Sequence, residues 1–158
     1  NWAEREFYLR HNAAYASLPN VKPYGPVDLL LACQYVTRNL GFAPADIAVL
    51  AESTAAHVAL EAAVRDSSAF RVVAIIGLTR RIEAPLSEKY PRTLQILAFH
   101  GAEDPFPPRF ALQMLTQTFG SEALKPPCGL WHVFPGEAHS LNLSMGYVHA
   151  TIISALYK

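Results

Sequence analysis

The stretch DIAVLAESTAAHVALEAAVR, residues 46–65, contains a short apolar run that passes through a serine into an alanine-rich segment. Residues 46–50 have the length and apolar character of a buried strand, and residues 54–65 consist mainly of helix-forming residues. A strand that leads directly into a helix is the repeating unit of α/β folds. This stretch therefore predicts an α/β fold with Ser53 at a strand-to-helix turn.

The same alternation continues on both sides of this stretch. Before it, apolar residues recur at helical spacing over 26–40, where Pro26 suits the first helical position and Gly41 the C-cap. After it, we expect strands over 71–76, 94–99 and 130–134, helices over 109–119 and 143–156, and a long loop or short helix over 79–92. Short apolar strands that alternate with helices predict a parallel sheet of about four strands flanked by helices.

The first 25 residues differ from the rest of the chain. Residues 2–17 are rich in helix formers, and residues 18–26 contain three prolines and a glycine, which exclude regular structure. We therefore predict an N-terminal helix and Pro-rich linker over 1–25 and one α/β domain over 26–158. The aromatic side chains of the first segment suit packing on the domain's own sheet edge and contact with a partner chain equally well.

Composition and charge argue against several classes of partner. Thirteen basic residues balance thirteen acidic ones, and the chain has no Lys/Arg run of the kind that binds nucleic acid or an anionic membrane. No apolar run is long enough to span a bilayer, and the absence of a signal-peptide pattern favours an intracellular location over secretion. Cys33 and Cys128 are expected to be reduced thiols in or near the core, although a single disulfide between them stays open.

Three polar residues follow three of the predicted strands. Ser53 follows the first strand, Asp104 the third and His139 the fourth, and functional groups gather at the carboxyl ends of strands in such sheets. A histidine can accept the proton of a serine hydroxyl, and a carboxylate can orient the histidine ring. The pattern predicts a catalytic triad of Ser53, Asp104 and His139, with the backbone N–H of Thr54 as an oxyanion donor.

Each of these residues also has an ordinary structural interpretation. Ser53 could be a helix N-cap, and Asp104 could start a turn, with Glu103 as its nearest rival for the acid. His100 ends a strand, where it is either packed in the core or lines the site. None of the six histidines has metal-ligand spacing, and the chain has no glycine-rich phosphate loop, so we expect neither a metal nor a cofactor.

Three short motifs resemble those of a known family. AESTAAHVALEAA, residues 51–63, resembles the nucleophile elbow of α/β-hydrolase esterases; HGAED, residues 100–104, resembles their acid turn; and GEAH, residues 136–139, resembles their histidine turn. Over residues 26–158 the chain is similar to the C-terminal half of the esterase/lipase-like α/β-hydrolases. The resemblance implies a serine hydrolase that acts on a small-molecule ester or amide without a cofactor.

The sequence departs from the family pattern in two places. Ala51 and Ala55 replace both glycines of the elbow, at an overpacking cost of about 1–2 kcal/mol. No His-Gly-Gly motif precedes Ser53 to supply the second oxyanion donor, and a half sheet leaves one apolar edge uncovered. Three explanations are open: a fragment of a longer hydrolase, a reduced homologue whose protein partner covers the edge, or a catalytically lapsed subunit with a structural role in a larger assembly.

Overall fold

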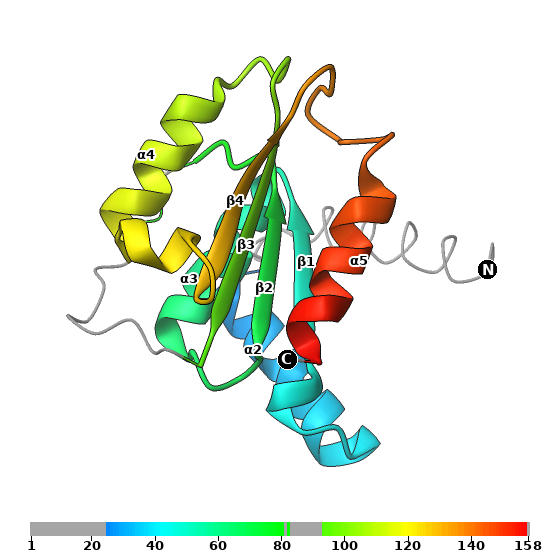
Figure 1. The fold of residues 1–158 in the computed structure, drawn as a ribbon. Coiled ribbons are helices and arrows are strands. Elements are labelled where there is room, and N and C mark those ends of the chain that lie inside the picture. Colours follow the sequence, from blue (N-terminus) through cyan, green and yellow to red (C-terminus); the bar gives the residue numbers. More distant parts are fainter. Residues whose placement is uncertain (1–24, 81, 83–92, 158) are drawn as a thin grey trace, which may run out of the picture.

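The computed structural model describes residues 25–80, 82 and 93–157 (Figure 1). The elements are α2 (Pro26–Leu40), the 3₁₀ helix η1 (Pro44–Asp46), β1 (Ala48–Glu52), α3 (Thr54–Arg65), β2 (Val72–Ile76), β3 (Gln95–Gly101), α4 (Pro108–Phe119), the 3₁₀ helix η2 (Ser121–Leu124), β4 (Gly129–Phe134) and α5 (Met145–Leu156). The helix and linker predicted over 1–25 lie almost entirely outside the described residues, as does most of 79–92. The predicted domain division therefore stays a prediction.

The four strands form one parallel sheet in the order β1-β2-β3-β4. β2, one of the two inner strands, is buried along its whole length, which explains why its sequence is continuously apolar instead of alternating. The prediction of an α/β fold with about four parallel strands flanked by helices is confirmed.

Helices cover both faces of the sheet, and alternate strand residues contact the two layers (Figure 1). Val73 and Ile75 of β2 belong to a core shared with α2, α3 and α4. Their neighbours Ala74 and Ile76 belong to a second core, which α5 covers through Val148, Ile152 and Ala155. The inner strands are therefore shielded from water on both faces, as in other parallel sheets.

The predicted helix and strand boundaries lie within two residues of the observed ones. Helices α2 and α3 have the predicted bounds, and the C-cap of α2 is Gly41, whose φ of 78° is left-handed. The prediction that the first strand starts at residue 46 was wrong, because residues 44–46 form a 3₁₀ turn in which the Asp46 carboxylate accepts the N–H of Ala43 at 3.2 Å. The strand instead begins at Ala48 and reaches Glu52.

Both cysteines are free thiols, as predicted. Burial raises the pKa of the Cys33 thiol, and the negative charge of Asp66 adds to the increase. Among the helices that the structure describes, none is long and apolar enough to cross a bilayer.

Candidate active site

Ser53 occupies a strained turn between β1 and α3. Its φ is 56° and its ψ is −122°, a sparsely populated conformation that costs about 1–3 kcal/mol and persists only where the surrounding structure imposes it. The side chain makes no capping hydrogen bond to α3, so the usual N-cap bond does not account for this serine. The strained turn forms although Ala51 and Ala55 replace the glycines of the family pattern.

Backbone contacts hold this turn at the carboxyl end of the sheet. The N–H of Ser53 donates to the carbonyl oxygen of Ile76, the last residue of β2, at 2.9 Å. Thr54 is the first residue of α3, where a backbone N–H has no acceptor within the helix. Its N–H therefore points out of the positive end of the helix dipole, as an oxyanion donor would.

Asp104 lies in the turn after β3, and its side chain is 2% exposed. One carboxylate oxygen, Oδ1, accepts the backbone N–H of Phe106 at 2.8 Å. The backbone N–H of Asp104 in turn donates to the carbonyl oxygen of Gly101 at 3.3 Å. The neighbouring Glu103 is exposed, so Asp104 is the carboxylate that the turn directs inward.

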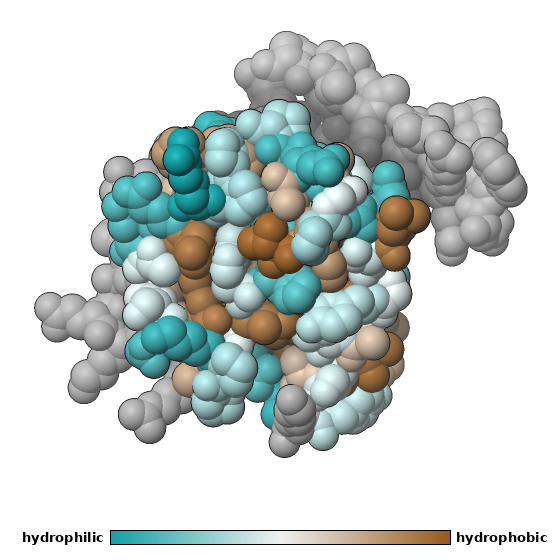
Figure 2. Space-filling view, turned by 45° about the horizontal axis from the view of Figure 1, so that its top comes forward, coloured by the Kyte–Doolittle hydropathy of each residue, from teal (hydrophilic) through white to brown (hydrophobic). Residues whose placement is uncertain are grey.

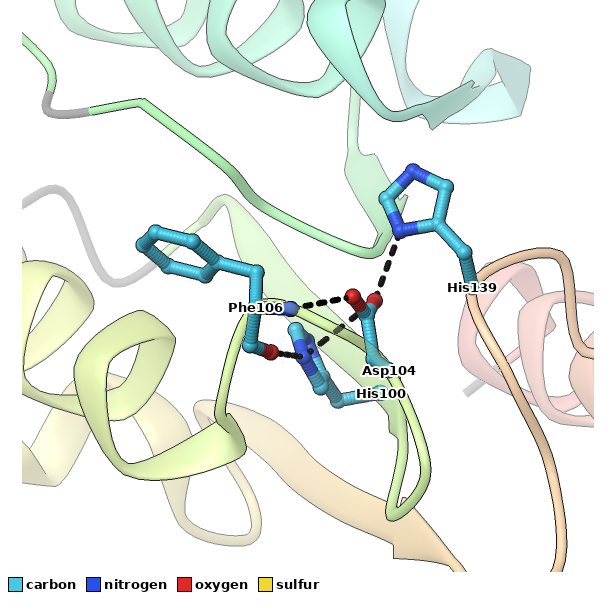
Figure 3. A network of polar contacts seen from close by, with 4 residues as sticks. All are labelled: His100, Asp104, Phe106 and His139. Carbon is cyan, nitrogen blue, oxygen red and sulfur yellow. Dashed lines mark hydrogen bonds and ion pairs between the residues drawn. The ribbon is translucent and has the colours of Figure 1, made fainter.

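His139 meets Asp104 across 35 residues of sequence. Its Nδ1 lies 2.6 Å from Oδ2 of Asp104 (Figure 3). Because a carboxylate oxygen accepts, Nδ1 carries the hydrogen of this contact, and in the uncharged ring the lone pair is on Nε2, which faces away from Asp104. The side chain of His139 is 30% exposed, whereas that of Asp104 is 2% exposed.

Two glycines make this arrangement possible. A Cβ on Gly101 would overlap the backbone carbonyl oxygens of Glu137 and Ala138, and a Cβ on Gly77 would lie 2.6 Å from Cε1 of His139. The acid and histidine turns are joined further by a 2.9 Å bond from the N–H of Glu103 to the carbonyl oxygen of Glu137. The sequence prediction missed both glycines; their position directly at a strand end is the signal that could have found them.

The serine turn and His139 meet the same strand end. The backbone N–H of Ser53 is hydrogen-bonded to the carbonyl oxygen of Ile76, and the residue after Ile76, Gly77, lies against the imidazole of His139. Among the described residues no hydrogen bond joins the Ser53 hydroxyl to the ring. The pairing of Ser53 with His139 therefore stays a prediction.

Comparisons with known proteins show which fold the chain has. No protein-family model and no curated protein sequence matches the chain. Its structure is similar to a predicted CIB-like hydrolase from Thermoplasma acidophilum (TM-score 0.57, 10% identity, covering 84% of this chain and 60% of that one). It is also similar to the esterase PE8 (TM-score 0.59, 20% identity, covering 81% of this chain and 59% of that one). A third similar structure is SOBER1 of Arabidopsis thaliana (TM-score 0.54, 18% identity, covering 85% of this chain and 68% of that one).

The chain has the α/β-hydrolase fold. The resemblance found in the three motifs is thereby confirmed at the level of the fold. The chain spans about 60% of the length of the hydrolase from Thermoplasma acidophilum and of PE8. The roles of Ser53, Thr54, Asp104 and His139 stay predictions.

The carboxyl end of this α/β-hydrolase sheet presents a mixed surface. Figure 2 turns that end toward the reader and shows apolar side chains near its centre with polar side chains around them. Two hollows, of about 440 and 560 Å³, lie at the opposite end of the sheet, where Arg71 and Gln95 line both. Within residues 25–80, 82 and 93–157, no three potential metal ligands converge.

Proposed function

We propose that this chain carries the catalytic residues of a serine hydrolase that cleaves a carboxylic ester or amide. The observation that carries the proposal is the 2.6 Å contact between His139 Nδ1 and the buried carboxylate of Asp104. It occurs at the end of the sheet where Ser53 is held in a strained strand-to-helix turn. An aspartate and a histidine so paired next to such a serine are the parts of an acyl-transfer site.

In the proposed reaction, the Ser53 hydroxyl oxygen bonds to the substrate carbonyl carbon while His139 Nε2 takes the hydroxyl proton. Asp104 keeps Nε2 available, because it holds the ring hydrogen on Nδ1. The carbonyl oxygen becomes an oxyanion that accepts a hydrogen bond from the Thr54 N–H. When the carbonyl re-forms, the bond from its carbon to the leaving alcohol or amine breaks, and His139 protonates the leaving group. Water then adds to the acyl-serine in the same way, the bond to the Ser53 oxygen breaks, and the acid and the free serine are released. General acid–base catalysis of this kind contributes roughly 10²–10⁴ in rate, and each oxyanion donor about 10²–10³.

The open edge of β1 supports a second part of the proposal. Among residues 25–80, 82 and 93–157, β1 pairs with β2 on one side only, and its Leu50 is 41% exposed. Exposed apolar edge strands invite pairing with further strands, and the matched hydrolases are longer than this chain. We propose that residues 26–158 are the C-terminal half of a hydrolase, and that a front half supplies the missing strands and the second oxyanion donor.

Active-site labelling tests the proposal. A fluorophosphonate probe reacts with a serine only where a neighbouring base activates it, so the native chain is expected to carry one adduct, on Ser53, found by peptide mass spectrometry. Ser53→Ala should abolish it, and Ser140→Ala, which removes an exposed serine beside His139, should not. A native, folded chain that gives no adduct on Ser53, alone and with its front half supplied, would contradict the proposal.

A specific surface favours a second candidate, a lapsed hydrolase that serves as a structural subunit. Helix α2 exposes Val27, Leu31 and Tyr35 by 52, 56 and 60%. Their spacing of four residues aligns them in one apolar stripe, which suits an apolar protein partner. This candidate predicts stable association without labelling of Ser53. Sedimentation of the chain as a monomer at micromolar concentration would argue against it.

A further inference from the structure

His100 lies directly behind the proposed acid. It is the second-last residue of β3 and has no solvent exposure. Its Nε2 lies 2.7 Å from the carbonyl oxygen of Phe106 (Figure 3). A carbonyl oxygen only accepts, so Nε2 carries the ring hydrogen. The other ring nitrogen, Nδ1, is buried and has no partner among the residues that the structure describes.

The same Nε2 lies 3.4 Å from Oδ2 of Asp104, the oxygen that accepts the hydrogen of His139. Phe106 completes the arrangement, because its backbone N–H donates to the other carboxylate oxygen of Asp104 at 2.8 Å. His100 is therefore linked to Asp104 through Phe106. The His100 ring donates to the carbonyl oxygen of Phe106, and the N–H of Phe106 donates to the Asp104 carboxylate.

Packing alone does not explain a histidine at this position. The ring of Trp131 lies beside His100, with 6.0 Å between ring centroids, and a phenyl ring would pack there as well. A phenyl ring would also avoid burying Nδ1 without a partner, which costs stability. The feature that histidine adds is the Nε2–H donor between Phe106 and Asp104, and buried donors act strongly because little water screens them.

We propose that His100 is a positioning residue for Asp104, an inference that rests on the proposed function. The hydrogen bond from His100 Nε2–H to Phe106 keeps the turn after β3 closed. The same N–H lies near Oδ2 of Asp104 and adds its dipole to that of the Phe106 N–H in stabilising the carboxylate. Loss of this donor lets the carboxylate rotate away from His139. The Nδ1–H of His139 then no longer has a fixed acceptor, and the ring hydrogen is distributed between Nδ1 and Nε2.

Two amide substitutions of similar size test the proposal in the full chain. Gln at position 100 places an amide N–H near the position of the imidazole Nε2, whereas Asn places it one bond nearer the backbone. His100→Gln should therefore rescue the contact, and His100→Asn and His100→Phe should lose it. The tautomer of His139 is read from ¹⁵N NMR correlations to its carbon-bound ring hydrogens, at a pH where the ring is uncharged.

Wild type and His100→Gln are expected to hold the His139 hydrogen on Nδ1, and His100→Asn and His100→Phe to move it partly to Nε2. With p-nitrophenyl acetate as substrate, the last two variants should lower kcat by about 10- to 100-fold with little change in KM, as expected for a misplaced catalytic group. If His100→Phe does not fold, the Gln and Asn variants decide.

The two readouts separate the two proposals. A wild-type chain without turnover or labelling contradicts the proposed function, whereas the His139 tautomer still tests the role of His100. An unchanged tautomer in folded His100→Asn overturns the positioning role. Equal losses of thermal stability in the Gln and Asn variants, with His139 unaffected in both, would assign His100 to packing alone and also overturn it.

Discussion

Replacement of Gly77 by alanine is the sharpest test of the site geometry. The added Cβ would lie 2.6 Å from Cε1 and 2.8 Å from Nδ1 of His139. Carbon atoms in contact prefer a separation of about 3.5–4.0 Å, so the ring must retreat by roughly 1 Å. That movement shifts the nitrogen that now lies 2.6 Å from Asp104. A misplacement of this size can lower the rate roughly 10²-fold.

The substitution also carries a backbone cost. Gly77 has a φ of 60°, and an L-residue in this region costs about 1–2 kcal/mol. For a chain of this size the melting temperature should fall by roughly 2–8 °C. Gly41→Ala is the matched control, because Gly41 has a φ of 78° and a Cβ there would meet nothing within 4 Å. It should lose similar stability and keep its activity.

Hydrolysis of p-nitrophenyl acetate, the rate of fluorophosphonate labelling and thermal unfolding followed by circular dichroism measure these effects. The expected pattern is a stability loss in both variants and an activity loss in Gly77→Ala alone. Wild-type hydrolysis and labelling rates in Gly77→Ala would refute the reasoning, because the ring of His139 would then not be held against Gly77 in solution.

Three further predictions concern other parts of the molecule. Asp104→Asn should slow ester hydrolysis by roughly 10²–10⁴ while the chain stays folded, since it removes the group that orients His139; an unchanged labelling rate would exclude Asp104 as the acid. Gly101→Ala should destabilise the chain by about 1–3 kcal/mol in urea unfolding, because the new Cβ meets backbone oxygens that cannot rotate away; a wild-type midpoint would show that the two turns separate freely. Brief N-ethylmaleimide treatment of the native chain should modify Cys128 before Cys33, because burial raises the pKa of the Cys33 thiol and so lowers its thiolate fraction at a given pH; mass spectrometry showing Cys33 modified first would contradict this.

Much of the fold could be predicted because its signals are local. The apolar spacing over 26–40 and the alanine-rich run over 54–65 specify helices through neighbouring residues alone. The continuously apolar strands predict a sheet buried on both faces for the same reason. The error at the start of β1 is also local in origin, because an aspartate side chain that bonds to the backbone competes with strand formation.

The sequence by itself placed Ser53, Asp104 and His139 after the first, third and fourth strands, and parallel strands end at one edge of a sheet. Only the tertiary structure decided how those strand ends meet. The space that Gly77 leaves for His139, the close approach at Gly101 and the bond from buried His100 to the acid turn all depend on where folded turns come to lie. The acid and the histidine are 35 residues apart, and the fit between their turns is set by packing between segments that local sequence patterns do not describe.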